Sequence, residues 1–175
     1  SSDFEIDKIK FLENLHDGLD IDFGNGSINR SKFINIGNDA IDLSGSKVTI
    51  NDTGINLVGD KMISVGENSN IEIINLDGSN SFVGIAVKDG SVIKADRIRL
   101  NNTKIGFAAY QKKEEYLYPK IIANNINIQN ANVKWLTDNN SKIVLNNKLI
   151  NSKTDKILPI IYEKNIELLN QNVSN

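Results

Sequence analysis

IDLSGSKV, residues 41–48, decides the fold because its pattern recurs along the chain. Related stretches are IDFGNGSI (21–28), ISVGENSNI (63–71), IAVKDGSV (85–92), FAAYQKK (107–113) and WLTDNNSKI (135–143). The six starting positions lie 20, 22, 22, 22 and 28 residues apart, and the insert KKEEYLYPK (112–120) accounts for the longest interval. Such a period is typical of a solenoid, in which one repeat cannot bury its apolar face without a neighbour.

Each repeat contains three short apolar segments separated by Gly, Ser or Asn. The third segment is seen in KFINI (32–36), IEIINL (71–76), RIRL (97–100) and NINI (125–128). Ile and Val favour strands, whereas Asn favours turns. A leucine-rich repeat of similar length would need an L-x-x-L-x-L motif and a helical return, and neither is present. We therefore expect an all-β fold, a right-handed parallel β-helix with about six coils of roughly 22 residues.

Stacked coils bring equivalent side chains together in columns. Alternate residues of a strand point inward, so the alignment predicts columns of apolar side chains along the axis. The first column is Ile21, Ile41, Ile63, Ile85 and Phe107, and the second is Ile28, Val48, Ile71, Val92, Ile121 and Ile143. Trp135 also falls at an inner position. A ladder of turn amides is expected from Asn101, Asn102, Asn124, Asn125 and Asn130.

Length and composition restrict the remaining possibilities. The 175 residues suit one solenoid, which we expect over residues 1–152, followed by a C-terminal strand or cap segment over 153–175. A net charge of −2 argues against nucleic acid as a partner. Without Cys, the chain forms neither disulfides nor thiolate metal sites. Its apolar runs are too short for a membrane span, and its first residues lack the pattern of a signal peptide.

Aspartates mark one outer face of the expected coils. If Ile41 and Leu43 point inward, Asp42 points outward, and the alignment places Asp22 beside it, about 5 Å away. Such carboxylates repel unless a cation, a shared proton or a lysine such as Lys61 neutralises them. Three interpretations remain open: solvent-exposed turn chemistry, a Ca²⁺ site and a catalytic site. The metal candidates are Asp20, Asp22 and Asp42, and the catalytic candidates are Asp22, Asp42 and Lys61. The cofactor is accordingly either none or Ca²⁺.

The insert at 112–120 and the neighbouring turns supply candidate ligand-binding residues. Tyrosines on a projecting loop either stack on sugar rings or cover the edge of a coil. The candidates are Glu67, Lys88, Tyr110, Lys112, Tyr116 and Tyr118, and carbohydrate is the expected ligand. His16, the only histidine, lies in a turn and is expected to be structural.

Several stretches resemble, in order, the parallel β-helix repeat regions of bacterial proteins, some of which accompany a CotH-kinase-like domain. These stretches are DGLDIDFGNGSI (17–28), GNDAIDLSGSKVTI (37–50), GDKMISVGENS (59–69), GIAVKDGS (84–91) and IGFAAYQKK (105–113). The resemblance covers roughly residues 9–130. The wider pectate-lyase-like superfamily includes lyases, polygalacturonases and epimerases that act on polysaccharides. Their catalytic signatures are not evident here, so the resemblance implies the fold more strongly than an activity.

Two functional hypotheses follow. The first is a non-catalytic β-helix module of a larger bacterial protein that binds polysaccharide or protein, or acts as a rigid spacer. The second is a lyase or hydrolase of an acidic polysaccharide, in which the aspartates hold Ca²⁺ or transfer protons and Lys61, Lys88 or Lys112 meets substrate carboxylates. The resemblance implies an extracellular or cell-surface location. Open solenoid ends are expected to allow end-to-end or lateral oligomers.

Overall fold

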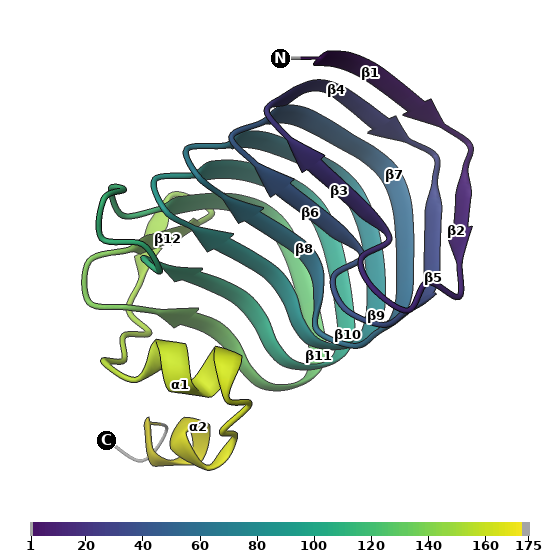
Figure 1. Cartoon of the computed structure of the whole chain (residues 1–175). Helices are drawn as coiled ribbons and strands as arrows, with labels where there is room; N and C mark the ends of the chain where they lie inside the picture. Colours follow the sequence, from purple (N-terminus) through teal and green to yellow (C-terminus); the bar gives the residue numbers. More distant parts are fainter. Residues whose placement is uncertain (1, 173–175) are drawn as a thin grey trace.

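The computed structural model describes residues 2–172 and shows a parallel β-solenoid of about seven turns (Figure 1). Strands make up 65% of the chain and helices 6%, with stacked coils about 22 residues apart. The predicted all-β parallel β-helix is therefore confirmed, with about one turn more than expected. Ser1 and residues 173–175, the end of the predicted cap segment, lie outside the described residues.

Each of the first six turns contributes one strand segment to each of three faces. The first three turns are β1 (Ser2–Asp7), β2 (Lys10–Leu12), β3 (Leu19–Asp22), β4 (Gly24–Asn29), β5 (Lys32–Ile36), β6 (Ile41–Ser44), β7 (Lys47–Val58) and β8 (Lys61–Gly66). The next three are continuous bent strands, namely β9 (Asn70–Lys88), β10 (Val92–Tyr110) and β11 (Lys120–Thr137). The last elements are β12 (Lys142–Leu145), β13 (Lys148–Ile150), α1 (Ile157–Tyr162) and α2 (Glu167–Asn172).

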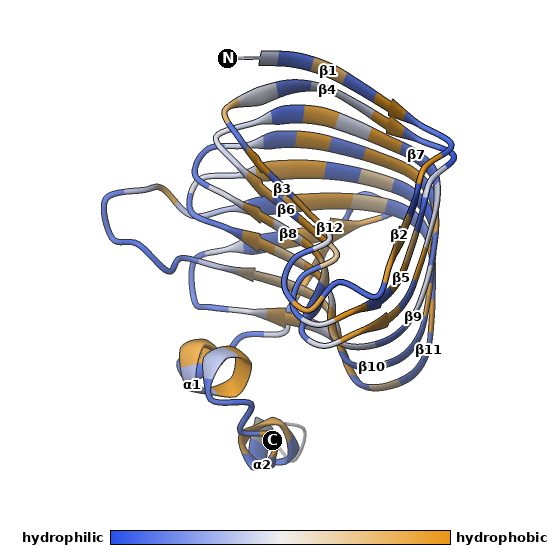
Figure 2. Ribbon diagram, turned by 45° about the vertical axis from the view of Figure 1, so that its right-hand side comes forward, coloured by the Kyte–Doolittle hydropathy of each residue, from blue (hydrophilic) through white to orange (hydrophobic). Residues whose placement is uncertain are grey.

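We call the faces first, second and third in chain order. The first face starts at β1, the second at β2 and the third at β3, and the later turns stack on these in parallel. The third face therefore contains β3, β6, β8 and the last segments of β9, β10 and β11. Figure 2 shows the alternation of apolar and polar residues along these strands. β13 departs from the pattern because it pairs with β12 in the antiparallel direction.

The inner column of the third face is largely as predicted. Ile41, Ile63, Ile85, Phe107 and Trp135 stack in successive turns. The predicted first member is wrong, because Leu19 pairs with Ile41 and Ile21 pairs with Leu43. The sequence LDIDF offers two apolar–x–apolar alignments that differ by two residues. A shift of two keeps every side chain on the same face, so the pattern alone does not distinguish them.

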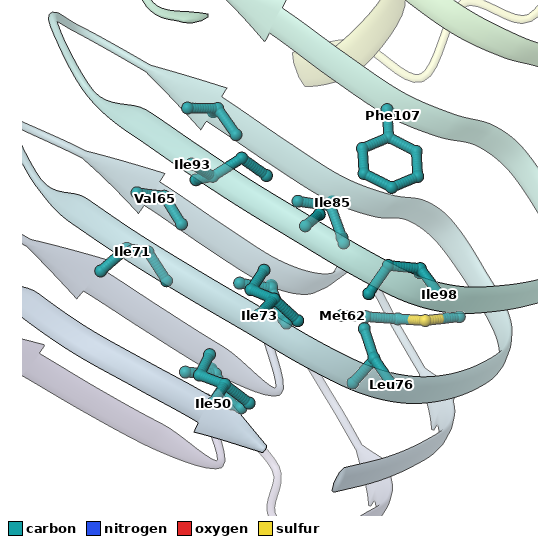
Figure 3. Packing of buried hydrophobic residues seen from close by; sticks show 14 of the residues in the cluster. Ile50, Met62, Val65, Ile71, Ile73, Leu76, Ile85, Ile93, Ile98 and Phe107 are labelled. Carbon is teal, nitrogen blue, oxygen red and sulfur yellow. The ribbon is translucent and has the colours of Figure 1, made fainter. Parts of the chain in front are cut away.

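Two members of the other predicted column are also misplaced. Ile28 pairs with Ile50, and the residue that stacks between Ile71 and Ile121 is Ile93 rather than Val92. The remaining members, Val48, Ile71, Ile121 and Ile143, pair in the predicted order. Figure 3 shows Ile71, Ile93 and Ile85 among the side chains that fill the interior. Fully burying an aliphatic side chain of this size contributes roughly 1.5–3 kcal/mol.

The corners between faces explain the abundance of Asn. The same corner position of successive turns adopts a positive φ, as at Asn80, Asn102 and Asn130 on the second corner. Asn tolerates this left-handed conformation better than most residues because its short side chain bonds locally. The Asn102 amide also donates to Asn80 Oδ1 at 2.6 Å, and Asn130 donates to Asn101 Oδ1 at 2.8 Å. The predicted amide ladder is thus confirmed for Asn101, Asn102 and Asn130, whereas Asn125 at the first corner donates to the Asp96 carboxylate instead of to another amide.

The two helices pack against the outside of the third face. Ile157, Ile160 and Ile161 of α1 join an apolar cluster with Ala86 and Ala108 of the sheet. The two alanines are completely buried although they point out of the solenoid. This second apolar cluster is separate from the interior, and it gives the third face a polar half and a covered half.

Candidate functional site

Outward side chains of the third face form a column along the solenoid axis. Successive Cα partners are Asp20, Asp42, Ser64, Ala86 and Ala108. The column begins with carboxylates, passes through a hydroxyl and ends with methyl groups. Its chemistry therefore changes at the place where α1 begins to cover the sheet.

The predicted pairing of Asp22 with Asp42 is wrong. Asp22 pairs with Ser44, and the carboxylate that neighbours Asp42 is Asp20. The physical reason is the same two-residue shift that displaced Ile21 from its predicted column. Burial and the charges of Asp22, Asp42 and Asp17 raise the pKa of Asp20. Asp20 thus lies in the acidic surroundings that the sequence predicted, with a different nearest partner.

Polar and charged side chains gather where the acidic part of the third face meets α1. We call this group the junction cluster. Its members are Asp39, Asp42, Asp60, Lys61, Ser64, Lys88, Tyr110 and Tyr162. Four of them were sequence candidates, namely Asp42, Lys61, Lys88 and Tyr110.

Lys61 lies at the centre of the junction cluster. Its side chain is 5% exposed, and its Nζ contacts Asp60 and lies 3.6 Å from Asp39 Oδ1. The same Nζ lies 5.5 Å from the centroid of the Tyr162 ring. Burial opposes the charge of Lys61, but the attraction of Asp39 and Asp60 outweighs it and raises the pKa of the ammonium group. Lys61 therefore links the carboxylates of two turns, the one before β6 and the one before β8, to the last residue of α1.

Asp39 is held by the backbone of the next turn. Its Oδ1 accepts a hydrogen bond from the Lys61 backbone N–H at 3.0 Å. Burial raises the pKa of Asp39 to about 6, against an ordinary value of 3.8, even though Lys61 favours the ionised form. A carboxyl group with this pKa exchanges its proton close to neutral pH.

Lys88 and two carboxylate oxygens without hydrogen-bond partners in the described part of the chain complete the polar part of the cluster. Lys88 Nζ donates to Ser64 Oγ at 2.9 Å, and burial lowers the pKa of Lys88. Asp42 Oδ1 and Asp60 Oδ1 are buried and have no hydrogen-bond partner among the described residues. These two oxygens could accept hydrogen bonds from water or from a ligand group.

Tyr110 does not lie on the surface, contrary to the sequence prediction. It is fully buried, its hydroxyl lies 2.9 Å from the Tyr162 hydroxyl, and burial raises its pKa well above 10.0. The reason is that α1 covers the third face at this turn. A ligand would contact Tyr162 or Lys112 first, because both side chains are exposed. The two lie together, with Lys112 Nζ 4.7 Å from the centroid of the Tyr162 ring.

The acidic candidates divide between two environments. Asp42 and Lys61 belong to the junction cluster, whereas Asp20 and Asp22 lie on the exposed N-terminal part of the same face. Across residues 2–172, no group of three or more His, Asp or Glu side chains is arranged to hold a metal ion. A Ca²⁺ site at Asp20, Asp22 and Asp42 stays a prediction.

The insert between β10 and β11 is a loop at the edge of the stack (Figure 1), and side-chain contacts tie it to the preceding turns. The buried Asp89 carboxylate accepts hydrogen bonds from the backbone N–H groups of Lys112 and Lys113 at 2.7 and 2.8 Å. Lys113 forms an ion pair with Glu67, and its Nζ lies 6.0 Å from the Tyr116 ring centroid. Glu67 and Tyr116 therefore help to fix the insert, whatever they bind.

Tyr118 lines a groove between the insert and the beginning of α1. We call it the insert groove, and its volume is about 260 Å³. The lining residues are Gln111, Tyr118, Asp138, Asn139, Asn140, Thr154, Asp155, Ile157 and Leu158. Tyr118 is 45% exposed, so its ring is available to a ligand. Amide, carboxyl and hydroxyl groups line much of the rest of the groove, and Ile157 and Leu158 of α1 add an apolar part.

Sequence reasoning missed Asp39, Asp60, Tyr162 and most of the insert groove. One signal was available, since the outward column changes to Ala86 and Ala108, which indicates a covered surface. No local signal existed for Tyr162, which reaches the third face only because α1 folds back onto it.

Comparisons of the chain with protein-family models, with curated proteins and with solved structures find no match. α1 and α2 have six residues each, and no helix in the described part of the chain is long and apolar enough to cross a membrane. The function is therefore inferred from the geometry of the junction cluster and the insert groove.

Proposed function

We propose that the chain is a non-catalytic β-helix module that binds polysaccharide in the insert groove. The observation that carries this proposal is the exposed ring of Tyr118 beside a row of amide and carboxyl groups. Sugars present C–H faces that stack on aromatic rings, and hydroxyl groups that bond to amides and carboxylates. The groove offers both kinds of contact within one concave surface.

The walls of the groove are held in place before any ligand arrives. Asp138 accepts hydrogen bonds from the backbone N–H groups of Gln111, Asn140 and Ser141 at 2.7, 3.0 and 2.7 Å. The Gln111 side chain in turn donates to the Tyr116 carbonyl. Binding at a fixed surface costs less ordering entropy than binding at a mobile loop. Asn139, Asn140 and Asp155 are exposed and remain accessible to sugar hydroxyls.

The resemblance to bacterial β-helix regions supports the same proposal. The pectate-lyase-like superfamily acts on polysaccharides, and some similar regions accompany a CotH-kinase-like domain. Under this proposal the chain belongs to that superfamily and serves as a rigid binding or spacing module of an extracellular or cell-surface bacterial protein. Stacked parallel turns with continuous β9, β10 and β11 are suited to such a rigid role.

Binding is tested by affinity electrophoresis and calorimetry with neutral and uronate-containing polysaccharides. We expect Tyr118→Ala to weaken binding of the best ligand at least tenfold, about 1.4 kcal/mol, because the stacking surface is lost. Leu117→Ala is the matched control, since Leu117 is 78% exposed in the same insert and does not line the groove. Binding that is unchanged in Tyr118→Ala, or absent in the parent protein, would refute the proposal.

A second candidate is favoured by the junction cluster. Asp39 has a pKa of about 6, and Asp42 Oδ1 lacks a partner among the described residues, features that accompany proton transfer at active sites. The corresponding activity is a lyase or hydrolase of an acidic polysaccharide with Lys61 or Lys88 near the substrate carboxylate. An increase in absorbance from unsaturated products, lost in Lys61→Met, would support it. No product with any uronate polysaccharide would exclude the lyase.

A further inference from the structure

We propose that the second corner of the solenoid carries a binding site for amphipathic carboxylates, molecules that join one carboxylate group to an aliphatic chain. The site is a groove of about 390 Å³ between this corner and the connection from α1 to α2. We call it the corner groove. Its volume falls within the usual range of small-molecule sites. The proposal is independent of sugar binding in the insert groove, because the two grooves share no lining residue.

Three successive turns shape the corner groove. Leu57 belongs to the third turn, Asn80 to the fourth and Asn102 to the fifth, and all three adopt a positive φ at the same corner. Gly59 and Ser81, which follow this bend, occupy little space and leave a hollow. The groove is therefore formed by the stacked corners themselves and exists before a ligand binds.

Part of the lining is apolar. Leu57 is 53% exposed, and the largely buried Val58 and Phe82 line the groove beside it. Transfer of apolar surface out of water is favourable, so an aliphatic chain that covers Leu57 would gain binding free energy. This part of the groove fits the chain of the proposed ligand.

The lining also supplies positive charge. Lys104 and Lys164 line the groove, and both are exposed. Within residues 2–172, Lys104 forms no ion pair, and no Asp or Glu lines the groove. Asp60 follows Gly59 in the chain, but its carboxylate contacts Lys61 in the junction cluster. An anion in the groove therefore meets two cations without a carboxylate among the lining residues to oppose it.

Lys164 is held in place by the corner that it faces. Its Nζ donates a hydrogen bond to the Gly59 carbonyl at 3.2 Å and lies 5.4 Å from the centroid of the Phe82 ring. An ammonium group has three N–H donors, so Lys164 retains donors for a carboxylate. Because the charge is already positioned, a ligand has less ordering entropy to overcome.

The amides of the corner favour an anion as well. Asn102 Nδ2 donates to Asn80 Oδ1 at 2.6 Å, and Asn80 Nδ2 donates to Asn56 Oδ1 at 2.8 Å. Each Nδ2 carries two hydrogens, so these bonds leave one N–H of each amide unused. Together with the two ammonium groups, the groove offers several donors. They match an ionised carboxylate, which only accepts hydrogen bonds.

Both parts of the lining are needed to explain the ligand class. A small inorganic anion would leave the apolar surface of Leu57 in water, and a neutral aliphatic molecule would leave Lys104 and Lys164 without an anionic partner. A molecule that carries both groups satisfies the whole groove, which is why we infer an amphipathic carboxylate.

Binding is tested by following the backbone amide NMR signals of the 175-residue chain during titration with octanoate. Octanamide has the same chain without the charge, and acetate has the charge without the chain. We expect octanoate to shift the signals of Leu57, Phe82 and Lys104 in a saturable manner, and the other two probes to bind about fivefold more weakly or worse. Octanamide or acetate binding as tightly as octanoate, or no saturable shift at these residues, would overturn the proposal.

Lysine variants test the role of charge. Lys104→Met and Lys164→Met keep an apolar stem and remove the ammonium group, and each should weaken octanoate binding about fivefold. Lys134→Met is the matched control, since Lys134 is exposed and lies outside the groove, and it should bind octanoate as the parent does. Affinity of Lys104→Met equal to that of the parent, or an equal loss in Lys134→Met, would contradict the assignment of the site.

A second pair of variants leaves the connection between α1 and α2 untouched. Lys164 also bonds to Gly59, so its substitution changes more than the charge. Leu57→Glu and Leu57→Gln alter an exposed side chain and differ from one another only in charge. We expect octanoate to bind Leu57→Glu about fivefold more weakly than Leu57→Gln, because a carboxylate in the groove repels the ligand. Equal affinity of these two variants, with equal melting temperatures, would refute the proposal.

Discussion

Asp39→Asn tests the energetic role of the junction cluster. The Asp39 side chain is 7% exposed, its Oδ1 lies 3.6 Å from Lys61 Nζ, and it also accepts the Lys61 backbone N–H. Burial raises its pKa from 3.8 to about 6. Asparagine keeps an oxygen for the backbone N–H but does not titrate, so the substitution isolates the contribution of the carboxyl proton.

Whether Asp39 stabilises or destabilises the protein at a given pH depends on which state, folded or unfolded, binds its proton more tightly. Between pH of about 4 and about 6, the folded Asp39 is protonated while the unfolded Asp39 is ionised, so the folded state holds more protons. The contribution of this group to the free energy of unfolding is therefore largest below this window and is lost as pH rises through the folded pKa. A pKa of about 6 in place of 3.8 corresponds to roughly 3 kcal/mol of unfolding free energy, at about 1.4 kcal/mol for each tenfold change in proton affinity.

We expect the free energy of unfolding of Asp39→Asn, relative to the parent, to rise by roughly 2–3 kcal/mol between acidic and neutral pH. Urea unfolding followed by circular dichroism at a series of pH values measures this difference. Lys61 retains Asp60 as a partner in the variant. Asp22→Asn, on the exposed part of the same face, controls for the loss of a charge. A difference between Asp39→Asn and the parent that does not vary with pH would refute the reasoning.

Two further predictions concern the third face. Ala108→Asp places a charge beneath α1 at a completely buried position, and we expect a loss of several kcal/mol of unfolding free energy in urea titrations. The exposed Asn132→Asp serves as its control, and equal stability of both variants would contradict the packing of α1. If the acidic column binds Ca²⁺, Ca²⁺ raises the melting temperature of the parent, and Asp20→Ala with Asp42→Ala abolishes the rise. A parent melting temperature that does not respond to Ca²⁺ would remove this site from consideration.

Much of the fold could be predicted because each turn carries the same short apolar pattern, which can be recognised in the sequence. Ile41, Ile63, Ile85 and Phe107 recur at the period of one turn, and the interior that they form is the one expected. Prediction failed at the first turn, where LDIDF permits two alignments. Only the pairing of Leu19 with Ile41 and the exposed corner at Phe23 distinguish them.

The candidate sites were less accessible to prediction. Asp42, Lys61 and Lys88 were recognised as polar outward residues, but their burial depends on neighbouring turns and on α1. Tyr110 was expected on the surface because the sequence of β10 does not indicate that α1 covers this side chain. Tyr118 was identified as an exposed aromatic residue, whereas the groove beside it requires the approach of the segment that begins at Thr154.

The sequence by itself determined a parallel β-helix, because a repeated apolar pattern specifies which side chains each turn must bury against the next. It also indicated the amide ladder, because Asn suits the left-handed corners. The tertiary structure alone decided the two-residue alignment of the first turn, the cover over Tyr110, and the meeting of Asp39 and Lys61 with Tyr162. The physical reason is that strand periodicity repeats every two residues, while the junction cluster depends on segments far apart in the chain that meet only after α1 docks.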